Sequence, residues 1–185
     1  MSLSNSLIGL SVLGCFLSTS HVLFAQLPQI RSEDSYGLTI SSPSGDLSPD
    51  SVSDLRCTLT NNSSKVVGRF VVLWTLTMAS GAQSTVTMVE DKLLIKSAPK
   101  LEPGQSVECE SSGSTTAGAG NPIAKVEVGI DYVEFVDGSK AGKDTQRMSQ
   151  LLRYRDQGAN DIRSYLRGFY KQKGIDALLQ ELNAN

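Results

Sequence analysis

Apolar and polar residues alternate along residues 36 to 142, and turn-forming residues interrupt the alternation about every ten positions. A period of two is the pattern of strands that bury one face, and many short strands separated by turns are typical of all-β sandwiches. We therefore expect a mainly β fold, an immunoglobulin-like antiparallel β-sandwich of about seven strands.

The strongest predicted strand spans residues 66–79, and Trp74, the only tryptophan, lies in its middle. One face of this strand carries Phe70, Val72, Trp74, Leu76 and Met78, and the other carries Arg69, Val71, Leu73, Thr75 and Thr77. Burial of a tryptophan removes about 150–250 Å² from water, so we expect Trp74 to anchor the core. The alternative is an exposed Trp74 on a ligand-binding face.

The other predicted strands cover residues 36–40, 55–60, 107–110 and 125–136. A further strand with Val86 and Met88 follows a turn at residues 80–83, and a short edge strand follows the Asp137-Gly138 turn. Residues 41–54 are expected to be a connection, and the Ser/Gly-rich residues 111–121 a mobile loop. Within the last long strand, Val126, Val128, Ile130 and Tyr132 share one face. Val133 and Phe135 are expected on the opposite face.

After Asp144 the pattern changes to that of an amphipathic helix, with apolar residues at steps of three or four: Met148, Leu152, Ala159, Ile162, Leu166 and Phe169. We expect Gly158 to kink or divide this helix and Gly174 to end it, before a last short helix with Ile175, Leu178, Leu179 and Leu182. The helices are expected to pack on the second face of the sheet, at Val71, Leu73, Val133 and Phe135, or to bind a partner.

Charge is segregated along the chain. The net charge is −2, but residues 31–144 hold 10 basic and 15 acidic side chains, whereas residues 145–185 hold 7 basic and 4 acidic ones. Arg153, Arg155, Arg163 and Arg167 form a possible partner surface. Two interpretations stay open: a solvated helix face that complements an acidic sandwich, or contact with an acidic partner or an anionic lipid headgroup. A nearly neutral chain gives no reason to expect nucleic acid.

The first 30 residues contain no charged side chain, and a short apolar run covers residues 7–17. This pattern predicts a signal peptide that ends near Ala25, with cleavage after Ser20 or a buried N-terminal helix as alternatives. Residues 12–15 also resemble a bacterial lipobox with Cys15 as the lipidated residue. Leu13 and the missing basic residues disfavour that reading. We expect an exported, periplasmic or extracellular protein with no transmembrane span after cleavage: residues 1–25 signal, 26–144 sandwich, 145–185 helices.

Cleavage would remove His21, the only histidine, and with it any histidine-dependent triad or imidazole metal site. Cys57 and Cys109 would remain, each on the apolar face of its strand. An exported chain favours a disulfide between them. By closing the loop between the two residues, it would stabilise the fold by about 4 kcal/mol. Two buried thiols are the alternative. Phosphate-loop, dinucleotide, metalloprotease and nucleophile-elbow motifs are all missing, so we expect no catalytic residues, cofactor or metal.

Three segments resemble bacterial exported immunoglobulin-like modules of the CARDB or FxLYD type. They are the Asn-rich turn at residues 61–64, the Leu-x-Pro-Gly-Gln-Ser entry at residues 101–106, and the strand end at residues 131–135 before Asp137-Gly138. The resemblance covers residues 36–142 and implies adhesion, display or accessory roles without a shared active site. We expect a non-enzymatic interaction module that binds another envelope or extracellular protein. A carbohydrate- or lipid-binding accessory domain is the alternative.

Overall fold

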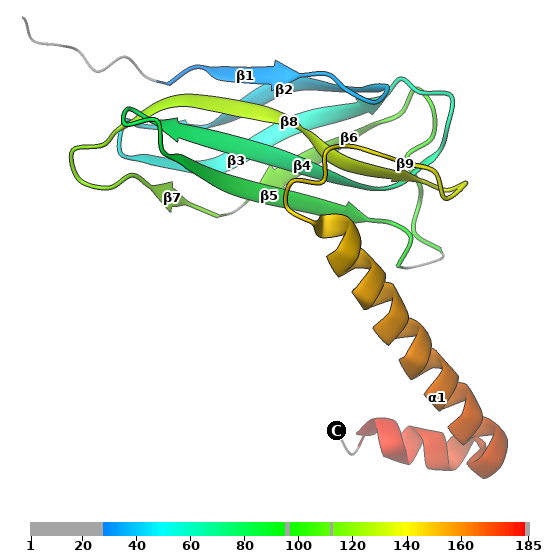
Figure 1. Ribbon diagram of the computed structural model, residues 1–185. Helices are drawn as coiled ribbons and strands as arrows, with labels where there is room; N and C mark the ends of the chain where they lie inside the picture. The colour runs from blue at the N-terminus through cyan, green and yellow to red at the C-terminus, as the bar shows by residue number, and fades with distance from the viewer. Residues whose placement is uncertain (1–27, 95–96, 112, 184–185) are drawn as a thin grey trace, which may run out of the picture.

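The computed structural model describes residues 28–94, 97–111 and 113–183. Two β-sheets pack face to face, and one long helix leaves the sandwich and projects away from it (Figure 1). The expected signal peptide, Cys15 and His21 lie outside the described residues. The fold is mainly β with a helical C-terminal extension, as the alternation and its change of period predict.

The described strands form a front sheet and a back sheet. The front sheet has the order β1-β8-β4-β5, with β9 also paired to β8, and the back sheet has the order β2-β3-β6, with β7 paired to β3. The strand bounds are β1 Ile30–Glu33, β2 Leu38–Leu47, β3 Ser51–Asn61, β4 Val67–Met78, β5 Gln83–Asp91, β6 Ser106–Ser111, β7 Thr115–Thr116, β8 Ile123–Phe135 and β9 Lys140–Ala141. The pairs are antiparallel except β1 with β8, which is parallel.

The core lies between the inner faces of the two sheets, where Trp74 is completely buried. Its indole Nε1 donates a hydrogen bond to the Met88 sulfur at 3.0 Å. Around it pack large apolar side chains of both sheets: Leu38, Leu55, Leu59, Phe70, Val72, Leu76 and Val126. Trp74 thus occupies the position expected of a core anchor.

Several strand boundaries differ from the sequence prediction. β2 extends to Leu47 and β3 begins at Ser51, so much of the expected connection at residues 41–54 is paired strand. Two register shifts interrupt the β2–β3 ladder between Ser41 and Asp46, and these irregularities hide the alternation there. β1 and β7 were not predicted, because both are short edge strands with few buried side chains.

A β-bulge in β8 overturns the expected orientation of that strand's end. Ile130 and Tyr132 pair with the consecutive residues Val72 and Val71, so Asp131 is an extra residue in the ladder. Side-chain parity inverts after it. Val133 therefore lies in the core, as does the nearby Phe135, whereas Tyr132 lies on the outer face. The expected helix-binding positions at residues 133 and 135 were wrong for this reason.

Cys57 and Cys109 lie directly opposite each other in the β3–β6 ladder, and both are buried in the core. Their predicted orientation is correct, but both are free thiols, so the expected disulfide is absent. The pKa of the Cys109 thiol is raised above its usual value. The hydrogen bond with the Cys57 sulfur is the larger cause, and burial is the second. The ladder already holds the two strands together, and the thiols fill core volume as small apolar side chains.

Helix α1 spans Met148–Asn183. It continues through Gly158, where a break was expected, and is interrupted at Gly174, whose φ of 80° and ψ of −179° are not helical. Leu152 is its buried residue, so only the base of the helix packs on the sheet. We call α1 the arm. Within the described part of the chain, no helix combines the length and apolarity that crossing a membrane requires.

Candidate interaction surface: the helical arm and its base

The bulge residue Asp131 holds the segment that leads into the arm. Its carboxylate is buried and accepts hydrogen bonds from the Thr145 amide at 3.0 Å, the Thr145 hydroxyl at 2.8 Å and the Gln146 amide at 3.3 Å. Gly142, with a φ of 121°, passes so close that a Cβ there would lie 2.3 Å from the Asp131 carbonyl oxygen. The start of the arm is therefore fixed against β8.

A small apolar cluster on the outer face of the front sheet receives the base of the arm. Leu152 packs on Val71 and Tyr132, with Met148 at the edge of the cluster. The Tyr132 hydroxyl donates a 2.7 Å hydrogen bond to the Glu134 carboxylate. The pKa of Tyr132 is raised above its usual value, mainly because the side chain is buried and secondly because of this hydrogen bond. The bulge at Asp131 is what brings Tyr132 to this face.

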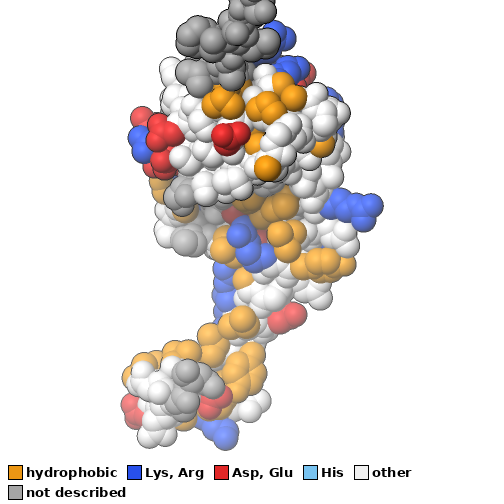
Figure 2. Space-filling model, turned by 90° about the vertical axis from the view of Figure 1, so that its left-hand side faces the viewer, with side chains coloured by type: hydrophobic (Ala, Val, Ile, Leu, Met, Phe, Trp, Pro, Cys, Tyr) orange, Lys and Arg blue, Asp and Glu red, His pale blue; other side chains and the backbone are white. Residues whose placement is uncertain are grey.

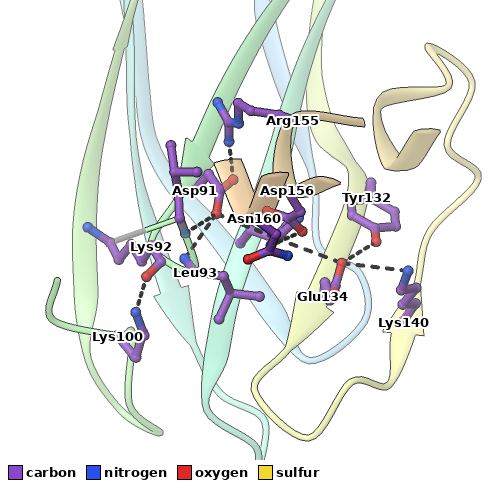
Figure 3. A network of polar contacts seen from close by, with 12 residues as sticks. Asp91, Lys92, Leu93, Lys100, Tyr132, Glu134, Lys140, Arg155, Asp156 and Asn160 are labelled. Carbon is purple, nitrogen blue, oxygen red and sulfur yellow. Dashed lines mark hydrogen bonds and ion pairs between the residues drawn. The ribbon is translucent and has the colours of Figure 1, made fainter. Parts of the chain in front are cut away.

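Arg69 lies at the centre of an ion-pair network between the sheet and the arm. Figure 3 shows its partners Asp91, Glu134 and Asp156. The Arg69 side chain is 4% exposed, and its Nη2 lies 2.9 Å from Oδ2 of Asp156 on the arm. Its Nε lies 3.4 Å from Oδ1 of Asp91 at the end of β5 and 3.9 Å from Oε2 of Glu134 on β8. One buried cation thus joins two strands to the helix.

Further contacts balance the charge of this network. Arg155 of the arm pairs with Asp91, and Lys140 lies 3.7 Å from Glu134. Oδ1 of Asp91 also accepts hydrogen bonds from the backbone amides of Leu93 and Leu94, at 2.9 and 3.1 Å. Three cations therefore face three carboxylates, as buried charges require. We interpret this cluster as a structural anchor for the arm rather than as a reactive centre.

Beyond its base, the arm exposes many large apolar side chains. These residues are all at least half exposed: Leu151, Tyr154, Ile162, Tyr165, Tyr170, Ile175, Leu179 and Leu182. The segment after Gly174 returns toward the first one, since the Tyr165 hydroxyl donates to the Glu181 carboxylate at 3.2 Å. That hydrogen bond raises the pKa of Tyr165. Figure 2 shows hydrophobic side chains gathered over the distal end of the arm.

The four arginines expected to form one partner surface divide into two groups. Arg155 pairs with Asp91, and Arg163 donates to the Leu94 carbonyl oxygen at 3.0 Å, so both contact the sandwich. Arg153 and Arg167 are exposed on the arm. Sequence reasoning missed the central role of Arg69. Its place on the same strand face as Val71 was the available signal, because a charged residue on a face covered by a helix needs a partner.

A concave surface, separate from the arm, lies on the outer face of the front sheet beside β1. It is a shallow groove with a largely polar lining that includes Arg31, Glu33, Thr75, Gln83, Glu127 and Lys143. No aromatic side chain is among its described lining residues, whereas small-molecule sites are mostly apolar and aromatic. Across the described ranges, no three His, Cys, Asp or Glu side chains are grouped to hold a metal ion.

Comparisons with known proteins give little to place beside this geometry. No family model matches the chain, and no curated protein matches it. A solved structure, described as the X-ray structure of Northeast Structural Genomics Consortium target SoR45, is 11% identical with a TM-score of 0.30. That match covers 57% of this chain and 79% of the other. A likeness this weak carries no argument about fold or function.

Proposed function

We propose that the protein is a non-enzymatic, exported interaction module of the cell envelope, whose immunoglobulin-like sandwich presents a helical arm to another envelope component. The observation that carries the proposal is the contrast within α1. Leu152 at the base is 2% exposed, whereas Ile162 is 62% exposed and Leu182 is 54% exposed. The helix is fastened at one end and leaves its apolar side chains uncovered.

Exposed apolar side chains that gather on one element mark interaction sites more often than scattered ones do. Burial of a large apolar side chain stabilises a complex by about 1.5–3 kcal/mol relative to full exposure. The arm carries eight such residues at half exposure or more, so a partner that covers even part of them gains a substantial free energy.

The anchor at Arg69 supports the same function. A segment that must become ordered on binding loses conformational entropy, and a segment held in place beforehand loses less. Asp131, Leu152 and Arg69 together hold the first turns of the arm against the front sheet. The sandwich thus acts as a rigid holder. The resemblance of residues 36–142 to CARDB or FxLYD modules agrees with a binding role.

The alternative function is a carbohydrate- or lipid-binding accessory domain. The groove beside β1 is the surface that would serve a carbohydrate, but its polar lining lacks the aromatic rings that such sites commonly use. We therefore place the interaction on the arm.

Site-specific photocrosslinking tests the proposal. A photoreactive amino acid at Ile162 samples the apolar side of the arm, and the same amino acid at Gln157, also exposed, samples its polar side. We expect envelope adducts, protein or lipid, from position 162 and few from position 157. Equal yields at both positions, or adducts at neither, would show that the arm does not meet a partner.

A further inference from the structure

We propose that the arm binds the surface of a bilayer containing anionic phospholipid and lies along that interface. This inference rests on the proposed function and names the class of partner. It is carried by two observations: the arrangement of tyrosines around the exposed apolar stripe, and the opposite charges of the arm and the sandwich.

The stripe on the first segment of the arm has an apolar centre and tyrosine margins. At about 100° per residue, Leu151, Ile162 and Leu166 lie near the middle of the stripe. Tyr154 and Tyr165 lie along one margin, with exposures of 56% and 55%, and Tyr170 lies along the other at 51%. A tyrosine has an apolar ring and a polar tip, and this residue is enriched where hydrocarbon meets water.

The segment after Gly174 adds a second apolar face. Ile175, Leu179 and Leu182 follow the spacing i, i+4, i+7, and their exposures are 52%, 50% and 54%. The break at Gly174 and the contact between Tyr165 and Glu181 keep this short segment beside the first one. Two short apolar faces on a bent arm suit an interface that is wide and flat. They do not form a span, since neither segment is long and apolar enough.

Charge complementarity selects the kind of surface. The arm carries 6 basic and 4 acidic side chains, whereas the sandwich from Arg31 to Asp144 has an acidic excess. Two pairs, Arg155 with Asp91 and Asp156 with Arg69, are used at the base and cancel in charge. The rest of the arm, including Arg153, Arg167 and Lys171, stays basic. Basic amphipathic helices bind anionic lipid surfaces, while the acidic sandwich is repelled toward water.

The same charges argue against a second copy as the occupant. Two arms that paired along their stripes would bring two net positive segments together. An arm that docked on another copy's sandwich would meet opposite charge, which is favourable. However, the described outer face of the front sheet offers mainly polar side chains such as Thr75, Gln83 and Glu127 to the apolar stripe. An anionic bilayer satisfies both the charge and the apolar requirement.

Vesicle flotation with the purified full chain, in its native processed form, tests the inference. The probes are vesicles of phosphatidylcholine alone and of phosphatidylcholine with phosphatidylglycerol. We expect at least about tenfold tighter binding to the anionic vesicles, weakening as salt is raised. Ile162→Asp should reduce that binding by roughly tenfold or more, because a carboxylate cannot enter the apolar part of the interface.

Gln157→Asp is the matched control, since it adds the same charge on the polar side of the same helix. It should keep binding within about threefold, by general electrostatics alone. Trp74 fluorescence and circular dichroism verify that both variants keep the fold. Equal binding to both kinds of vesicle, or equal losses in the two variants, would overturn the inference.

Two further outcomes separate this inference from the proposed function. If the chain binds neither kind of vesicle but position 162 crosslinks to an envelope protein, the lipid inference fails and the interaction module stands. If sedimentation shows a dimer that Ile162→Asp dissociates, and vesicles are not bound, the stripe is covered by a second copy and the lipid inference is wrong.

Discussion

Replacement of Arg69 by Met removes the cation at the centre of the anchor. Met matches the apolar stem of Arg and carries no charge, so the change deletes the ion pairs to Asp91, Glu134 and Asp156 and keeps the packing of the stem. Arg69 and Asp91 are each 4% exposed, so the carboxylate of Asp91 cannot regain full hydration when its partner is lost.

Loss of one partner of a buried ion pair costs about 3–5 kcal/mol, since the other charge is left uncompensated. Asp91 keeps its ion pair with Arg155 and its hydrogen bonds from the amides of Leu93 and Leu94. We therefore expect a loss of stability at the lower end of this range, about 3 kcal/mol. For a chain of this size that corresponds to a fall of roughly 6–12 °C in the midpoint of thermal unfolding.

Arg56→Met is the matched control. Arg56 and Glu110 form a pair at 3.9 Å on the back sheet, with side chains 60% and 59% exposed. Exposed pairs contribute about 0–1 kcal/mol, so this variant should unfold within about 3 °C of the wild-type protein. Differential scanning calorimetry and chemical denaturation measure both variants. An Arg69→Met midpoint no lower than that of Arg56→Met would refute the anchor as described.

Three further predictions concern other parts of the chain. Gly174→Ala places a side chain where φ is 80° and ψ is −179°, a conformation essentially confined to glycine; the arm should straighten, and an unchanged maximum dimension in small-angle scattering would contradict this. Cys57 and Cys109 should resist a maleimide in the native protein and both react in denaturant without reductant; a denatured chain that takes up no label would instead contain a disulfide. Asp137, which accepts hydrogen bonds from Ser139 and Lys65, has its pKa lowered to about 2. A lowered pKa stabilises the fold above the ordinary carboxyl pKa of about 3.9, and that contribution is lost as pH falls through the folded value; an NMR titration midpoint near 3.9 would disprove it.

The sequence alone was sufficient for the features that repeat along the chain. The alternation in residues 66–79 predicts that Trp74 is buried, and the change of period after Asp144 predicts the helix. Both features persist over many residues, so the burial of one face leaves a clear periodic trace. Cys57 and Cys109 follow the same rule, since each faces the core as its strand parity predicts.

Only the tertiary structure decided where that periodicity is broken and which charges meet. A single extra residue at Asp131 inverts the faces of Val133 and Phe135 and brings Tyr132 to the arm. The sequence predicted the interruption at Gly174, but the continuous helix through Gly158 was decided by the structure, because either glycine is free to adopt helical or non-helical backbone angles. Arg69, Asp91, Glu134 and Asp156 come from separate elements, so their pairing has no local pattern. Periodic burial is a property of neighbouring residues, whereas bulges and ion-pair networks depend on contacts between distant ones.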